Sequence, residues 1–268
     1  MDLTAPSPGA AALKLNARQL GSSNHPHVVI AHGLFGSASN WQTIARNLEN
    51  HFCLWLVDLR NHGDSPHSEE MTYSAMAEDL ARFIDSHCEG QASLVGHSMG
   101  GKAAMTTALN YPERVQSLMV MDSAPISHRS PFNAYIQAMM NIDLRQLESR
   151  SQADAALSEV VTEAGVRGFL LQNLRTVDKA WRWRINLPVL ARCLSDLSAF
   201  PTLSGRFSGP VNFLRGGDSD YVPEDVAERF SHLFTNATLQ TIDNAGHWLH
   251  AQQPAQVTEA IRSFLTAT

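Results

Sequence analysis

Hydrophobic residues along this chain gather in short apolar runs, and between the runs they recur every three or four positions. The runs predict strands at residues 28–31, 52–57, 92–96, 117–122, 211–215 and 239–242. The spacing between the runs predicts helices at residues 41–49, 73–87, 101–110, 223–233 and 254–266. Strand and helix in alternation are typical of an α/β fold with a mostly parallel central sheet flanked by helices on both faces.

The alternation is interrupted between residues 126 and 207. This stretch has no clear buried strand, and its apolar residues have helix-like spacing. We therefore expect a helical cap, residues 126–207, inserted into an α/β core of residues 1–125 and 208–268. Before the first apolar run, residues 13–20 alternate and predict an edge strand, and the Pro- and Ala-rich residues 1–12 predict a loose tail. The apolar positions in the expected cap include Tyr135, Met139, Val160, Leu170, Leu171 and Leu174.

The composition describes an ordinary globular protein and excludes several kinds of partner. Of 268 residues, 44% are hydrophobic and 17% are charged, and the net charge is −6 without a long basic block, so nucleic acid is not an expected partner. No apolar run approaches the ~20 residues of a membrane span, and the start of the chain does not resemble a signal peptide. The three cysteines, Cys53, Cys88 and Cys193, are widely spaced. We expect a cytoplasmic protein with reduced thiols and no membrane association.

A glycine-rich turn carries the first candidate for chemistry. Gly96, Ser98 and Gly100 form a Gly-x-Ser-x-Gly pattern between a predicted strand and a predicted helix. The turn is too tight for side chains two residues on either side of the serine, so glycine is needed there. The helix that follows points its free N–H groups at the oxygen of the carbonyl group that the serine would attack. We expect Ser98 to be a nucleophile.

A candidate acid and a candidate base follow the serine along the chain. Asp122 ends one apolar run, and His247 follows the last predicted strand. The order serine, acid, histidine is the one expected of an α/β-hydrolase arrangement. A serine hydroxyl needs a neighbouring base at neutral pH, and we expect His247 to accept its proton. His97 and His250 are the nearest competitors, and we expect a packing role for His97.

The whole chain resembles an α/β-hydrolase, and more closely the YbfF-type bacterial esterases. The resemblance implies an α/β-hydrolase fold, a serine esterase activity on a small-molecule ester and no required cofactor. The segments that carry it are residues 32–37, 58–65, 96–102, 122–125, 216–219 and 246–250.

The sequence offers more than one candidate for the acid. A common α/β-hydrolase pattern places the acid four residues before a proline, and counting back from Pro223 leads to Ser219, which Asp218 and Asp220 flank. The esterase resemblance implies a serine at this position and a charge from Asp122. A hydroxyl can accept the His247 N–H but cannot stabilise an imidazolium as a carboxylate does. We expect Asp122 to supply the charge and Ser219 to orient, with Asp218 as the alternative acid.

Backbone and loop positions complete the expected site. An oxyanion hole needs two preorganised N–H donors, and we expect those of Met99 and Leu34, with Phe35 as the neighbour in doubt. The segment at residues 58–65 contains Asp, His and Asp, but a self-bonded loop is expected there in preference to a metal site. Lys102 at the start of the elbow helix is expected in a structural ion pair.

These patterns predict a serine hydrolase. It would cleave carboxylic esters, or thioesters such as acyl-CoA, of small to medium acyl groups through an acyl-enzyme, without cofactor or metal. Two alternatives stay open: a carbon–carbon bond hydrolase of the same fold, and a ligand-sensing protein of this fold with slow turnover.

Overall fold

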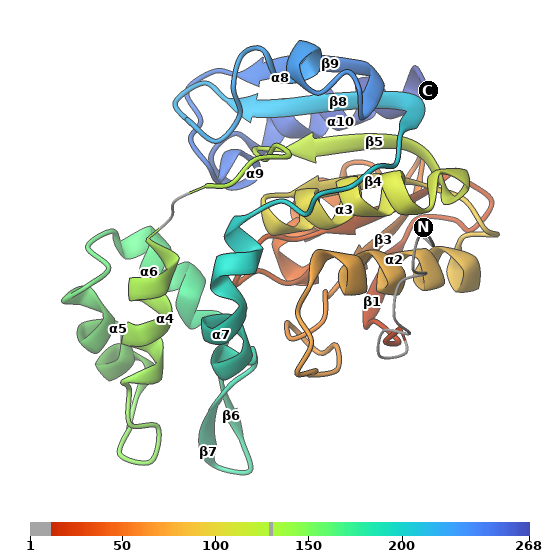
Figure 1. Cartoon of the computed structure of the whole chain (residues 1–268). Coiled ribbons are helices and arrows are strands. Elements are labelled where there is room, and N and C mark those ends of the chain that lie inside the picture. The colour runs from red at the N-terminus through yellow and green to blue at the C-terminus, as the bar shows by residue number, and fades with distance from the viewer. Residues whose placement is uncertain (1–11, 129–130) are drawn as a thin grey trace, which may run out of the picture.

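The computed structural model describes residues 12–128 and 131–268, which centre on a seven-stranded sheet (Figure 1). The strand order is β1-β3-β2-β4-β5-β8-β9, and all neighbours are parallel except β1, which is antiparallel to β3. The bounds are β1 (Ala17–Leu20), β2 (His27–Ala31), β3 (Cys53–Val57), β4 (Ala92–His97), β5 (Val115–Met121), β8 (Phe207–Gly216) and β9 (Phe234–Ile242). The predicted α/β fold with a mostly parallel sheet is confirmed.

Helices cover both faces of this sheet. They are α1 (Gln42–Arg46), α2 (Tyr73–His87), α3 (Met99–Asn110), α8 (Val226–Arg229), α9 (Leu249–Gln252) and α10 (Pro254–Thr266), with short 3-10 turns at Ala38–Trp41 and Pro112–Arg114. In β2, Val29 and Ala31 join one hydrophobic core with α2 and α3, whereas Val28 and Ile30 join a second core with α1 and α10. Successive strand side chains point to opposite faces, so a strand buried on both faces appears in the sequence as an unbroken apolar run.

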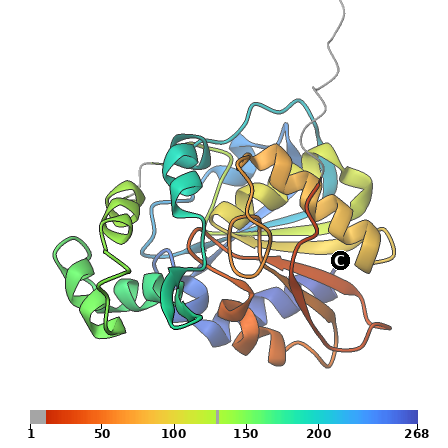
Figure 2. The same cartoon turned by 90° about the horizontal axis from the view of Figure 1, so that it is seen from below.

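Between β5 and β8 the chain leaves the sheet and forms a separate group of elements, here called the inserted segment. It comprises α4 (Phe132–Met140), α5 (Arg150–Ser158), α6 (Ala164–Leu171), β6 (Leu174–Val177), β7 (Ala180–Trp183) and α7 (Leu187–Ser198). Figures 1 and 2 show it to one side of the sheet, beyond the carboxyl ends of the parallel strands. In parallel sheets this edge is where ligands bind.

The inserted segment is not wholly helical, because β6 and β7 form an antiparallel hairpin. Its two-residue turn, Asp178 and Lys179, has φ values of 49° and 63°, the left-handed conformation that a tight hairpin turn requires at both central positions. Leu174, expected on a helix, begins β6 and is the one buried residue of that strand. Both strands are otherwise partly exposed, so they lack the apolar run by which the sequence revealed the buried strands.

Three other elements are shorter than predicted. The edge strand begins at Ala17, because the N–H of Leu13 donates to Asp79 Oδ1 at 2.6 Å and not to a neighbouring strand. The helix expected at residues 41–49 is a 3-10 turn followed by α1. The helix expected at residues 223–233 is only α8, because turns follow it into β9. Residues 1–11 of the expected tail lie outside the described residues, and the division into a core and a cap stays a prediction.

Candidate active site

Ser98 lies at the sharp turn between β4 and α3, as expected. Its backbone has φ 53° and ψ −117°, a strained conformation for a residue with a side chain, and its N–H donates to Met121 O at 2.9 Å. Glycine is required beside it: a Cβ atom at Gly96 would lie 2.3 Å from Gly100 O, and one at Gly100 would lie 2.5 Å from Ala31 O. This turn holds the Ser98 hydroxyl above the carboxyl end of the sheet.

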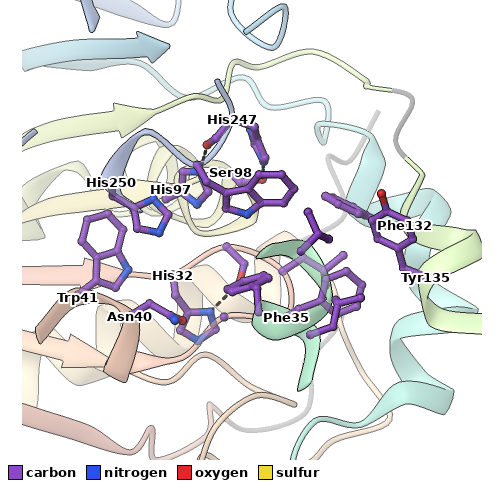
Figure 3. A pocket seen from close by; sticks show the side chains of 17 residues that line it. His32, Phe35, Asn40, Trp41, His97, Ser98, Phe132, Tyr135, His247 and His250 are labelled. Carbon is purple, nitrogen blue, oxygen red and sulfur yellow. Dashed lines mark hydrogen bonds between the residues drawn. The ribbon is translucent and has the colours of Figure 1, made fainter. Parts of the chain in front are cut away.

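His247 and Asp122 continue a hydrogen-bonded chain from this hydroxyl. The Ser98 Oγ lies 3.1 Å from His247 Nε2, and His247 Nδ1 lies 2.8 Å from Asp122 Oδ2. Asp122 directly follows β5 and is fully buried, while His247 comes from the loop between β9 and α9. Figure 3 shows His247 beside Ser98 at the edge of a pocket. The structure therefore brings together three residues that are far apart in the sequence and that the sequence selected.

The carboxylate of Asp122 is held from both of its oxygens. Oδ1 accepts the N–H of Gly216 at 3.0 Å, and Oδ2 accepts the hydroxyl of Ser219 at 2.6 Å as well as facing His247. Ser219 therefore orients Asp122 and does not bond to His247. The Ser219 hydroxyl donates to the Asp122 carboxylate and does not accept the His247 N–H. The side chain of Asp218 is exposed, and its backbone N–H donates to Ala245 O. The geometry favours Asp122 over Asp218 as the acid.

The loop after β2 carries the second expected oxyanion donor. The N–H of Phe35 is already used, because it donates to His62 Nε2 at 3.3 Å. Within residues 12–128 and 131–268, no protein acceptor pairs with the N–H of Leu34 or of Met99. Met99 is the first residue of α3, where a helix leaves its N–H groups without an intrahelical partner. The two donors expected from the sequence are therefore available to a ligand.

Two buried histidines hold this loop in place. His62 Nδ1 donates to Arg60 O at 3.0 Å, which leaves Nε2 to accept the Phe35 N–H. His32 Nδ1 contacts Gly33 O at 2.8 Å, and its Nε2 accepts the N–H of Leu59 at 3.0 Å. Burial lowers the pKa of His62 to about 3 and also lowers that of His32. Both rings are therefore neutral at pH 7, as these acceptor roles require.

The loop at residues 58–65 is built by hydrogen bonds to one carboxylate. Asp58 Oδ1 accepts the N–H of Ala38 at 2.7 Å, and its Oδ2 accepts the N–H of Asp64 at 2.9 Å. The described residues contain no group of three or more His, Cys, Asp or Glu side chains that could hold a metal ion. The contacts of Asp58 are those of a loop-forming residue.

His97 and His250 pack behind His247. His97 Nε2 donates to the carbonyl of His247 at 2.7 Å, and the His97 ring lies 4.6 Å from that of His250. The His250 ring stacks on Trp41 at 4.7 Å. Burial lowers the pKa of His97 and lowers that of His250 to about 4, so both are neutral packing residues at pH 7. His97 has the packing role expected from the sequence, but its position behind His247 was not predicted.

A pocket of about 440 Å³, including space open to solvent, lies over Ser98. One wall holds Ser98 and His247, and Figure 3 shows Phe132 and Tyr135 facing them from the inserted segment. The periodicity of the sequence does not identify which residues of this segment reach the site. The apolar side chains that line the pocket from the inserted segment and the last loop are Phe132, Tyr135, Val166, Phe169, Leu170 and Trp248.

Lys102 does not form the ion pair that the sequence led us to expect. Its ammonium donates to Ser198 O at 2.8 Å and to Ala199 O at 2.9 Å, at the end of α7. No carboxylate of the described residues lies within ion-pair distance of it. The structure thus places a buried cation, without a counterion among the described residues, one helical turn after Ser98.

Comparison with known proteins agrees with this geometry. Residues 26–254 match the family described as alpha/beta hydrolase fold. The chain belongs to the alpha/beta hydrolase fold family. This alpha/beta hydrolase is 41% identical to the sn-1-specific diacylglycerol lipase ABHD11 of Mus musculus, an alignment that covers 91% of this chain and 82% of that protein. It is 36% identical to Esterase YbfF of Escherichia coli strain K12, over 94% of this chain and 99% of that protein.

A solved structure shares the whole architecture. The structure titled "Marine microorganism esterase" has a TM-score of 0.90 and 36% identity, and the match covers 94% of this chain and 100% of that one. Together with the curated relatives, this makes the protein an esterase/lipase-type alpha/beta hydrolase. None of the helices in the described ranges has the length and apolar character to cross a bilayer.

Proposed function

We propose that this protein hydrolyses carboxylic esters with Ser98 as the nucleophile, through a covalent acyl-enzyme. The observation that carries the proposal is the continuous chain from Ser98 Oγ to His247 Nε2, at 3.1 Å, and from His247 Nδ1 to Asp122 Oδ2, at 2.8 Å. This arrangement provides a nucleophile, a base that can take its proton, and a carboxylate that orients the base.

The reaction has two halves with the same proton carrier. Ser98 Oγ attacks the ester carbonyl while His247 Nε2 accepts the hydroxyl proton, and the protonated imidazole then returns that proton to the departing alcohol. A water molecule next gives a proton to His247 and attacks the acyl-enzyme, and the imidazolium then returns this proton to Ser98 Oγ as the acid leaves. Asp122 stabilises the imidazolium in both halves, and Ser219 holds the carboxylate of Asp122.

The carbonyl oxygen gains negative charge in both halves, and the backbone would stabilise it. The N–H groups of Leu34 and Met99 lack a protein acceptor in the described ranges and belong to the two loops that meet at Ser98. Donors fixed before the reaction stabilise the developing oxyanion without reorganisation. His62 and His32 act as positioning residues for the loop that carries Leu34.

The substrate class follows from the pocket. Its apolar lining suits acyl groups of small to medium length. Thioesters such as acyl-CoA also fit this proposal, because they present the same kind of acyl carbonyl to Ser98. The names of the relatives, a lipase and an esterase, favour ester hydrolysis over carbon–carbon bond cleavage and over ligand sensing. We also propose that the inserted segment acts as a cap over the pocket and that the protein is cytoplasmic.

The proposal is tested by steady-state hydrolysis of p-nitrophenyl esters from acetate to palmitate, with Ser98→Ala measured alongside. We expect turnover that falls by several orders of magnitude in Ser98→Ala, with circular dichroism and thermal unfolding unchanged. An optimum chain length would report the size of the acyl pocket. Turnover that is equal in both proteins would refute a serine nucleophile.

A further inference from the structure

A second cavity meets the first one at Ser98. It lies between α3 and the end of α7, and its empty volume is about 410 Å³, including space open to solvent. Leu34 and Phe132 line both cavities, so an ester bound at Ser98 would extend one half into each. The polar residues that line the second cavity are Tyr73, Ser98, Lys102, Ser123, His128, Ser198 and Tyr221.

Lys102 gives this cavity an uncompensated positive charge. The residue is only 4% exposed, and two of the three ammonium N–H groups are satisfied by the carbonyls of Ser198 and Ala199. A buried charge without an opposite charge is unfavourable, and burial accordingly lowers the pKa of Lys102 to about 8. Lys102 lines a cavity that also holds the reacting Ser98, so a ligand bound there can supply a negative charge.

His128 is a second unsatisfied group in the same cavity. Its Nε2 is buried and has no hydrogen-bond partner among the described residues. Its ring stacks on that of Tyr221 at 4.6 Å, which fixes the plane of the imidazole. Burial and the nearby charge of Lys102 lower the pKa of His128, although a hydrogen bond to the Tyr221 backbone and the charge of Asp220 act in the opposite direction. A bound anion would oppose the lowering of this pKa and favour a proton on Nε2, which could then donate to the anion.

We propose that the second cavity binds a carboxylate carried by one half of the ester substrate, with Lys102 as its counterion and His128 as a further donor. The apolar half of the same substrate then occupies the first cavity. This inference rests on the proposed ester hydrolysis at Ser98. No covalent bond changes at Lys102, so it acts as a specificity-determining residue. Lys102 follows Ser98 by about one helical turn, ~5.4 Å along the axis, and both residues line this cavity, so one small substrate can contact both.

The test compares kcat/KM within two pairs of matched esters. Phenyl hemiglutarate carries a carboxylate on the acyl half, and phenyl pentanoate is its neutral counterpart. The compound 4-(butyryloxy)benzoate carries the carboxylate on the alcohol half, and 4-methylphenyl butyrate is neutral. We expect the wild-type protein to prefer the charged member of one pair, and the pair in which this occurs identifies the half of the substrate that enters the second cavity.

Variants at Lys102 separate recognition of charge from a role in anchoring α7. Lys102→Met should lower the preference for the charged ester by roughly 10- to 100-fold, the effect expected for losing a hydrogen bond to a charged group. Lys102→Arg should retain most of the preference. Lys14→Met, the same substitution at an exposed site, is the matched control and should leave the preference unchanged.

Two results would overturn the inference: a wild-type preference for the neutral member of both pairs, or a Lys102→Met variant that loses the same factor on both members of a pair. If Lys102→Met does not fold, the inference is tested on the wild-type protein, by measuring how product analogues inhibit its hydrolysis of phenyl pentanoate. Glutarate or 4-hydroxybenzoate should then inhibit at lower concentration than the uncharged pentanamide or 4-methylphenol, and equal inhibition refutes the inference. Absence of Ser98-dependent hydrolysis of the neutral esters would instead refute the proposed function.

Discussion

The hydroxyl of Ser219 donates to Asp122 Oδ2 at 2.6 Å, the same oxygen that lies 2.8 Å from His247 Nδ1. Asp122 is fully buried, so this oxygen has no water to replace either partner. The position that holds an acid in a common pattern of the fold thus holds a serine, and that serine bonds to an acid from a neighbouring strand. Residues that follow two neighbouring strands, β5 and β8, thus act together to orient His247.

Replacement of Ser219 by alanine is expected to lower kcat by about tenfold, with a smaller effect on KM. The loss corresponds to part of one hydrogen bond to a charged group, about 1.5–3 kcal/mol. Asp122 keeps its bonds to Gly216 and His247, so activity should not vanish. Steady-state kinetics on a p-nitrophenyl ester would measure the effect, with Ser231→Ala at an exposed site as the control. An unchanged kcat would mean that Ser219 does not contribute.

The two candidate acids should respond very differently to loss of charge. Asp122→Asn is expected to lower kcat by roughly 10²- to 10⁴-fold, because a neutral amide cannot stabilise the His247 imidazolium. Asp218→Asn should change kcat by less than about twofold, since its side chain is exposed. Both variants differ from wild type by the same chemical change, so each is the control for the other. The reverse ranking would move the acid to the later strand.

His62 offers a test of the loop that carries the expected oxyanion donor. His62→Leu removes the acceptor of the Phe35 N–H, which is buried, and should let the loop move. We expect kcat to fall by about tenfold or more while KM changes little, because oxyanion stabilisation acts in the transition state. A boronic acid that mimics the tetrahedral intermediate should bind more weakly by a similar factor.

The matched control for this test is His51→Leu, at an exposed position. A purely structural role of His62 would lower the melting temperature without changing boronic acid affinity in the folded protein. That outcome would contradict a positioning role.

Acid should destabilise the protein through its buried histidines. Burial lowers the pKa of His250 to about 4, below the ordinary histidine value of ~6.5 that applies to the unfolded chain. Between these two values the unfolded state binds more protons, so stability is complete above pH ~6.5 and is lost as the pH falls toward 4. We expect this residue alone to remove about 2 kcal/mol of unfolding free energy between pH 7.5 and pH 5.

The measurement is urea unfolding of the wild type and of His250→Phe at both pH values. Phenylalanine keeps a ring to stack on Trp41 and removes the titrating group, so the variant should lose about 2 kcal/mol less on acidification. His232→Phe, at an exposed site, should show the wild-type dependence. Equal losses in all three proteins would assign the acid sensitivity to other groups.

Local patterns were sufficient to predict much of this protein. The inner strands are buried on both faces, so they appear as apolar runs, and α2 and α10 have the bounds that their spacing predicted. The tight turn around Ser98 requires glycines that can be recognised in the sequence. β6 and β7 could not be predicted in this way, because their residues are partly exposed and form no apolar run.

The sequence by itself determined the fold class and selected Ser98 and His247, because strand burial and the glycine turn are encoded over a few neighbouring residues. The tertiary structure adds the observation that favours Asp122, the acid expected from the sequence, over Asp218. Parallel pairing of β5 with β8 sets Met121 opposite Leu214, which brings the next residue, Asp122, to the N–H of Gly216 and leaves Asp218 in solvent. Likewise, only the approach of Lys102 to the end of α7 shows that its ammonium has carbonyl partners and no acid within residues 12–128 and 131–268. Contacts between distant strands and helices depend on register and packing, which no local pattern contains.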